Sequence, residues 1–184
     1  MRRLFLFFLL ALPSLGCSPP APLAAADVKP GAHGTFGDET LTVGKENRTY
    51  RLVVPKSVNL DKPAPLVIAF HGLLIDNKDV MPKYTKLDEL AADKKFILAF
   101  PEARDKAWGL APDKVQSDLA FFDELLKTVR ARYKTDPDRV YVLGMSNGGY
   151  FAHLVGKERS KVVAAVASHS GPLGLQTLLG IRAD

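Results

Sequence analysis

The sequence has little cysteine, few long apolar segments and no cluster of positive charge. Its one cysteine, Cys17, excludes an intramolecular disulfide, so stability must come from a hydrophobic core. The longest apolar run, residues 4–12, is too short to span a bilayer. Lys and Arg number 25 against 20 Asp and Glu, but they do not gather in one segment. The basic balance therefore gives no reason to expect a nucleic-acid partner.

The N-terminal end has the organisation of an export signal: two arginines, the apolar run, and a Leu-Gly-Cys sequence that ends at Cys17. That ending resembles a bacterial lipoprotein processing box, although Ser14 stands where the box usually has Leu. We therefore expect residues 1–16 to be removed and Cys17 to be lipidated, which would anchor the exported protein at the cell envelope. Free secretion with an incidental cysteine is the alternative. Without the signal, 23 basic and 20 acidic residues remain.

Residues 18–37 contain four prolines together with several Ala and Gly. This composition predicts a flexible linker between the anchor and a folded domain. The whole chain is 47% hydrophobic and 24% charged, which is typical of one globular domain. We expect that domain to occupy residues 38–184.

Strand and helix patterns alternate along the domain. Two β-rich runs, 39–43 and 48–54, predict an antiparallel hairpin. The strands expected after it are 66–70, 96–100, 140–143 and 162–167, and the expected helices are 83–93, 117–132 with Ser117 as its cap, and one after residue 146. Such alternation predicts a parallel sheet with right-handed crossovers. The expected fold class is α/β, a mostly parallel sheet with an antiparallel N-terminal hairpin that ends after the sixth strand.

The segment that organises the chain is Gly144-Met145-Ser146-Asn147-Gly148, with a strand pattern before it and a helix pattern after it. G-x-S-x-G in this context is the nucleophile elbow, a strained turn that exposes the serine Oγ. Glycine is expected at Gly144 and Gly148, with Gly149 beside them, because neighbouring backbone passes too close for a Cβ. At the helix N-terminus, the Asn147 N–H and the helix dipole can meet a developing oxyanion. An ordinary β-to-α turn is the alternative.

His71-Gly72-Leu73 follows the first strand of the parallel series. This His-Gly is a reduced form of the HGGG-type loop that supplies a second oxyanion donor in lipases and esterases. We expect the Leu73 N–H to be that donor, with His71 and Gly72 shaping the loop. The alternative is a histidine that is only hydrogen-bonded at a strand end.

Four segments carry a pattern that extends beyond these two motifs: 64–72, 100–102 with Trp108, 118–122 and 136–149. Together they resemble the secreted esterase family of polyhydroxybutyrate depolymerases and feruloyl esterases, over about residues 50–171. The resemblance implies an α/β-hydrolase that cleaves carboxylic esters, small or polymeric, through an acyl-serine on Ser146 and without a metal or other cofactor. It also implies that Trp108 lines the substrate cleft, although a single Trp also suits core packing.

The family places its triad in the order Ser, acid, His, with the last two on loops after later strands. Only residues 168–184 follow the sixth expected strand here. We therefore expect the acid and the base to be missing from this sequence, the domain to be partial, the sixth strand to be an exposed edge, and the chain itself to be weakly active or inactive. His169 is a candidate substitute base, whereas His153 is expected to pack or cap. Three further acids are interpreted as structural: Asp118 in the first turn of a helix, and Asp136 and Asp138 in a turn.

Three functional hypotheses follow. The first is a serine esterase whose sequence stops early. The second is a non-catalytic surface lipoprotein that keeps part of the family domain as a binding module. The third is a peptidase, because an elbow and an oxyanion hole serve any acyl transfer.

Overall fold

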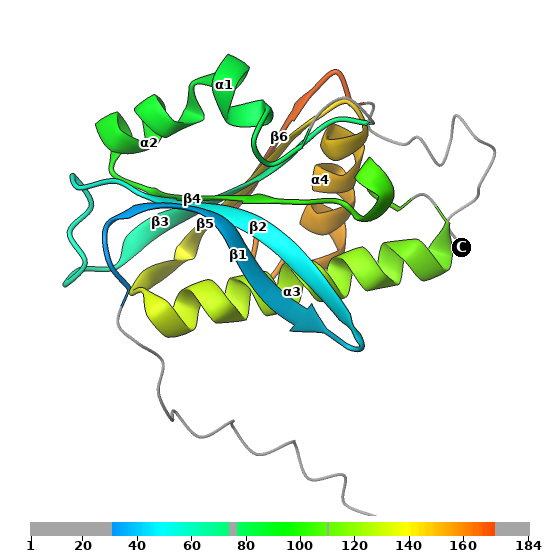
Figure 1. Ribbon diagram of the computed structural model, residues 1–184, viewed down its shortest axis with the longest axis horizontal. Helices are drawn as coiled ribbons and strands as arrows, with labels where there is room; N and C mark the ends of the chain where they lie inside the picture. The colour runs from blue at the N-terminus through cyan, green and yellow to red at the C-terminus, as the bar shows by residue number, and fades with distance from the viewer. Residues whose placement is uncertain (1–30, 74–76, 110, 172–184) are drawn as a thin grey trace, which may run out of the picture.

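The computed structural model describes residues 31–73, 77–109 and 111–171. Its centre is a six-stranded sheet in the order β1-β2-β4-β3-β5-β6 (Figure 1). The four strands β4, β3, β5 and β6 are parallel, whereas β1 and β2 form a hairpin that joins β4 in antiparallel fashion. The expected α/β class, a mostly parallel sheet with an antiparallel hairpin, is confirmed. The predicted signal, Cys17 and residues 18–30 of the predicted linker lie outside the described residues.

The strands are β1 Gly34–Val43, β2 Glu46–Val54, β3 Ala64–Phe70, β4 Ile97–Pro101, β5 Thr135–Met145 and β6 Ala165–His169. The central strands β3 and β4 are almost wholly buried, which explains their unbroken apolar runs. Helices α1 (Met81–Thr85) and α2 (Leu87–Lys94) lie on one side of the sheet in Figure 1, and α3 (Pro112–Arg132) and α4 (Asn147–Glu158) lie on the other. Each side has its own buried apolar cluster, so the sheet is covered on both faces.

The first strand begins at Gly34, so residues 34–37 belong to the sheet and not to the linker in which they were expected. Gly34 pairs with Val54 and the register shifts between Phe36 and Glu39. Two glycines in this stretch hide the strand from pattern analysis, because glycine has a low strand propensity. At the other end of the sheet, β6 begins at Ala165 and not at residue 162.

Two of the helix predictions need correction. The helix expected over 83–93 is interrupted at Lys86, which has a left-handed φ of 52°. There the Thr85 Oγ1 donates to the Met81 carbonyl at 2.8 Å and accepts from the Leu87 N–H at 3.4 Å, and such side-chain bonds compete with the helical ladder. The next helix, α3, starts at Pro112, five residues before the expected cap at Ser117. Proline is favoured in a first helical turn because its φ is already helical.

The last described strand, β6, forms one edge of the sheet, and the side chains of Ala165, Ala167 and His169 are exposed. Val162 and Val163 precede it in a turn, where both of their N–H groups donate to the Arg159 carbonyl. That turn explains the late start of the strand, since those amides are not free to pair with β5. No helix in the described part of the chain is both long enough and apolar enough to cross a membrane.

Candidate active site

Ser146 lies in the tight turn between β5 and α4. Its φ of 51° and ψ of −117° are strained for a residue with a Cβ. Two backbone bonds hold this conformation: the Ser146 N–H donates to the His169 carbonyl at 2.8 Å, and its carbonyl accepts from the Tyr150 N–H at 3.1 Å. The serine therefore occupies the N-cap position of α4, where the free N–H groups and the helix dipole favour negative charge.

Two glycines allow the turn to be this tight. A Cβ on Gly144 would clash with the backbone of Gly148, and a Cβ on Gly148 would clash with the carbonyls of Phe70 and His71. The start of α4 consequently packs directly on the end of β3, which brings the turn at Ser146 against the loop that follows β3. Gly149 lies against β6, where an added Cβ would come within 2.5 Å of the Ser168 Oγ.

The loop after β3 is held by the buried side chain of His71, of which 1% is exposed. Its Nε2 accepts from the Ala103 N–H at 3.0 Å, so the ring proton is assigned to Nδ1, which donates to the Gly72 carbonyl at 2.6 Å. That carbonyl and the Leu73 N–H belong to one planar peptide unit. The His71 ring thus fixes the orientation of the amide that was expected to be the second oxyanion donor.

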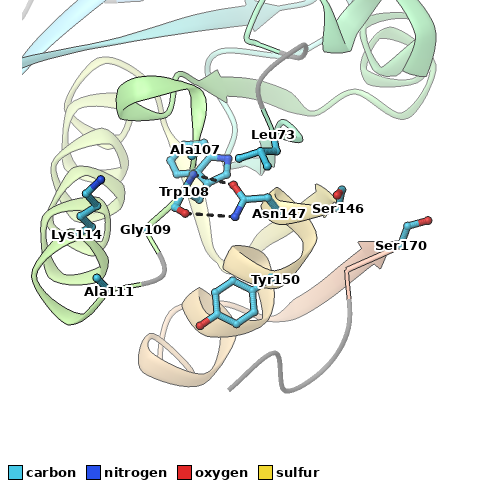
Figure 2. Close-up of a pocket in the computed structure, with 10 residues that line it drawn as sticks. All are labelled: Leu73, Ala107, Trp108, Gly109, Ala111, Lys114, Ser146, Asn147, Tyr150 and Ser170. Atoms are coloured by element: carbon cyan, nitrogen blue, oxygen red, sulfur yellow. Dashed lines mark hydrogen bonds between the residues drawn. The ribbon is translucent and has the colours of Figure 1, made fainter. Parts of the chain in front are cut away.

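A cleft of about 470 Å³ opens beside Ser146 (Figure 2). Its described lining residues are Leu73, Ala107, Trp108, Gly109, Ala111, Lys114, Ser146, Asn147, Tyr150 and Ser170. The predicted nucleophile and both predicted oxyanion-donor residues therefore border one cavity. Among the described residues that line the cleft, only Lys114 carries a charge. Burial raises the pKa of the Tyr150 phenol, so that side chain is neutral at ordinary pH.

Trp108 borders this cleft and also packs in the core, so both alternatives considered for it are correct. Its ring stacks on Phe151 with centroids 4.9 Å apart and meets Phe70 edge-on at 5.0 Å. The Trp108 Nε1–H donates to the His71 carbonyl at 3.0 Å. Its backbone N–H donates to Asn147 Oδ1 at 2.8 Å, and its carbonyl accepts from Asn147 Nδ2 at 3.2 Å (Figure 2). The elbow motif predicted a role only for the Asn147 backbone N–H, and nothing in the motif indicates this side-chain contact.

Asp118 is structural, as expected, but it lies in the second turn of α3 and not in the first. Its Oδ1 accepts from Arg48 Nη2 at 2.8 Å and its Oδ2 accepts from the Gly109 N–H at 2.7 Å. Both members of this ion pair are buried, with 4% of each side chain exposed. The carboxylate therefore anchors the residue that follows Trp108.

Neither His169, the candidate substitute base, nor His153, which was expected to pack or cap, is among the described residues that line the cleft. The His169 side chain is exposed on β6, and His153 lies within α4. Across residues 31–73, 77–109 and 111–171, no side chain hydrogen-bonds the Ser146 Oγ, and no group of three or more His, Cys, Asp or Glu residues is arranged to hold a metal ion. Asp136 and Asp138 were expected in a turn but lie at the start of β5, where the Asp136 carboxylate accepts from the Asp138 N–H and from Arg139 Nε. Asp and Asn side chains that bond to nearby backbone in this way are typical of turns, which is why the sequence pattern was misleading here.

The strand order, the strained serine after β5 and the oxyanion-type loop after β3 define an α/β-hydrolase fold. A solved S-formylglutathione hydrolase from Staphylococcus aureus shares this fold, with a TM-score of 0.64 and 19% identity over 83% of this chain and 62% of that one. A ferulic acid esterase from Anaeromyces mucronatus, solved with ferulic acid, gives a TM-score of 0.53 and 17% identity over 77% of this chain and 60% of that one.

The chain belongs to the esterase PHB depolymerase family, whose sequence profile matches residues 48–178. Feruloyl esterase D of Neurospora crassa is 29% identical over 184 residues, which cover 92% of this chain and 61% of that protein. The chain spans 49% and 61% of the lengths of the first two curated relatives that it matches.

Proposed function

We propose that this chain carries the nucleophile and the oxyanion hole of a carboxylic ester hydrolase that acts through an acyl-serine. The observation that carries the proposal is the strained Ser146 at the N-terminus of α4, bordering a cleft that Leu73 and Asn147 also line. A β-to-α turn with no catalytic role has no need of a non-glycine residue at a φ of 51°.

In the proposed reaction, the Ser146 Oγ attacks the ester carbonyl carbon and its proton passes to a general base. The carbonyl oxygen becomes an oxyanion, which the N–H groups of Leu73 and Asn147 receive together with the dipole of α4. Collapse of the intermediate expels the alcohol, which takes a proton, and leaves the acyl-serine. Water then attacks the acyl carbon and regenerates the serine. No described side chain hydrogen-bonds the Ser146 Oγ, so we place the base outside the described residues.

The proposed substrates are esters of aromatic or hydroxy acids. The feruloyl esterases among the relatives, and the description of the family as esterase PHB depolymerase, suggest this class. The cleft is compatible with it, since the exposed apolar side chain of Leu73 can contact an acyl chain or ring while Lys114 meets a negative charge.

A fluorophosphonate probe tests the proposed nucleophile. The full-length protein should be labelled, and Ser146→Ala should abolish labelling. Ser160→Ala is the matched control, because Ser160 is exposed in the turn after α4. Labelling that persists in Ser146→Ala would refute the assignment.

We also propose export, with residues 1–16 as signal peptide, Cys17 as the lipidated residue and residues 18–30 as the linker, because residues 31–33 are hydrogen-bonded to the folded domain. Labelled palmitate should enter the protein, and Cys17→Ala should abolish the label and release the protein from the membrane fraction. A mature N-terminus beyond residue 17 would point to ordinary secretion instead.

A non-catalytic binding module is the second candidate, because no described residue activates Ser146. Such a module would bind an ester in the cleft without consuming it. Saturable ligand binding with no probe labelling and no turnover would favour this candidate over the esterase.

A further inference from the structure

We propose that Trp108 is a positioning residue that braces the two halves of the oxyanion hole against each other, with the Asn147 side chain as its anchor. This inference rests on the proposed esterase function. It assigns to Trp108 a task beyond lining the cleft, and to Asn147 a side-chain task beyond its backbone N–H.

The two proposed donors come from separate segments of the chain. The Leu73 N–H follows β3, whereas the Asn147 N–H begins α4. An oxyanion hole works only if its donors keep a fixed spacing around one oxygen atom. Something must therefore hold the end of β3 and the start of α4 in register at the level of the cleft.

Trp108, in the connection between β4 and α3, bonds to both segments. Its indole N–H donates to the His71 carbonyl at 3.0 Å, two residues before Leu73. Its backbone N–H and carbonyl are both bound by the Asn147 amide, at 2.8 Å and 3.2 Å. A continuous chain of hydrogen bonds thus runs from the loop after β3, through Trp108, to the residue that follows Ser146.

The ring contacts connect the same two elements. Phe70, the last residue of β3, meets the Trp108 ring edge-on, and Phe151 of α4 stacks on it with an interplanar angle of 6°. Only 1% of Trp108 is exposed, and Asp118 holds the next residue through the Gly109 N–H. The Trp108 side chain is consequently buried, and Trp108 is held by β3, by α4 and, through Gly109, by Asp118.

The two hydrogen bonds between the Asn147 amide and the Trp108 backbone form a clamp, and this clamp explains why an amide stands at residue 147. One end of the Asn147 side chain accepts and the other donates, which matches the N–H and the carbonyl of a single residue. Both polar atoms of the Asn147 side chain bond to Trp108, and the N-cap position of α4 belongs to Ser146. In Asn147→Asp a second acceptor would face the Trp108 carbonyl, although helix-dipole effects alone favour an acid in a first turn. The new carboxylate also lies close to the developing oxyanion and repels it, so a loss in that variant combines the broken clamp with a charge effect. Trp108→Phe adds no charge and therefore isolates the brace.

Two variants of the full-length protein test the brace. Trp108→Phe keeps an aromatic ring but removes the Nε1–H that donates to the His71 carbonyl. Asn147→Asp replaces the hydrogen bond to the Trp108 carbonyl by repulsion between two oxygen atoms. Loss of an oxyanion donor costs serine hydrolases about 10²- to 10³-fold in kcat. For displacement of a donor we expect a smaller loss, about 10- to 100-fold, in kcat and in the rate of fluorophosphonate labelling, with KM changed less than about threefold. Asn59→Asp, the same chemical change at an exposed site, is the matched control and should keep the wild-type rates.

Trp108 is the only tryptophan in the sequence, so fluorescence reports the brace directly. Asn147→Asp should shift its emission to longer wavelength and increase acrylamide quenching, and the shift should shrink below about pH 4, where a protonated carboxyl regains a donor. The wild type at each pH is the reference. Trp108→Phe carries the kinetic test alone if Asn147→Asp fails to fold.

The outcomes separate this inference from the function on which it rests. If the wild type is labelled and both variants react within twofold of it, the brace is wrong. A kinetic loss shared equally by Asn59→Asp would also overturn it. If the wild type is neither labelled nor active, the esterase proposal fails and the brace fails with it.

Discussion

Replacing Gly148 by Ala puts a methyl group at the closest backbone contact of the site. The new Cβ would clash with the carbonyls of Phe70 and His71, and both obstacles are backbone atoms that cannot rotate away. Overpacking of this kind costs about 1–3 kcal/mol of unfolding free energy. Relief of the clash requires α4 to move away from β3, which displaces Ser146 from the loop that carries Leu73. Stability and reactivity should therefore fall together.

The matched control is Gly37→Ala in β1, where an added Cβ would meet no atom within 4 Å. That variant should unfold within about 0.5 kcal/mol of the wild type, as surface substitutions usually do. Urea unfolding gives the free energies, and the rate of fluorophosphonate labelling gives the reactivity. If Gly148→Ala unfolds at the wild-type midpoint and labels at the wild-type rate, the close packing of α4 on β3 is not what positions the serine.

Two further predictions concern the surroundings of the cleft. Asp118→Ala leaves the Arg48 charge buried without its partner and should lower the unfolding free energy by about 3–5 kcal/mol. Glu124→Ala, at an exposed pair with Lys127 on the same helix, should change it by less than about 1 kcal/mol. Equal urea midpoints for the two variants would contradict the role of the buried pair. Lys114→Glu should raise KM for an ester with a free carboxylate, whereas KM for a neutral nitrophenyl ester should stay within about twofold of the wild-type value. The difference is a charge effect, so added salt should weaken it. Equal changes in KM for both substrates would contradict this prediction.

The sequence predicted the elements wherever a period or an apolar run was strong. The buried strands β3 and β4 and the long helix α3 are examples, since burial on two faces or on one stripe leaves a clear pattern. Errors arose where one side chain decided the outcome. Thr85 interrupts a helix by local hydrogen bonds, and Gly34 begins a strand that composition assigned to a linker.

The local geometry at Ser146 was predictable because its motif encodes a turn within five residues. The contacts that hold the site together were not, because they join residues distant in the sequence. The Trp108 backbone and the Asn147 amide are 39 residues apart, and Arg48 and Asp118 are 70 apart. Neither pairing leaves a periodic or compositional signal. A buried aspartate early in a long helix is the only hint that a cationic partner was needed.

The most direct test of the central claim is to trap the acyl-serine. The full-length protein is mixed with a nitrophenyl ester, quenched in acid during turnover, digested, and analysed by mass spectrometry. We predict an added acyl mass on Ser146 that is absent after complete hydrolysis. Acylation of a different residue, or steady turnover with no acylated peptide when deacylation limits the rate, would contradict the proposed role of Ser146.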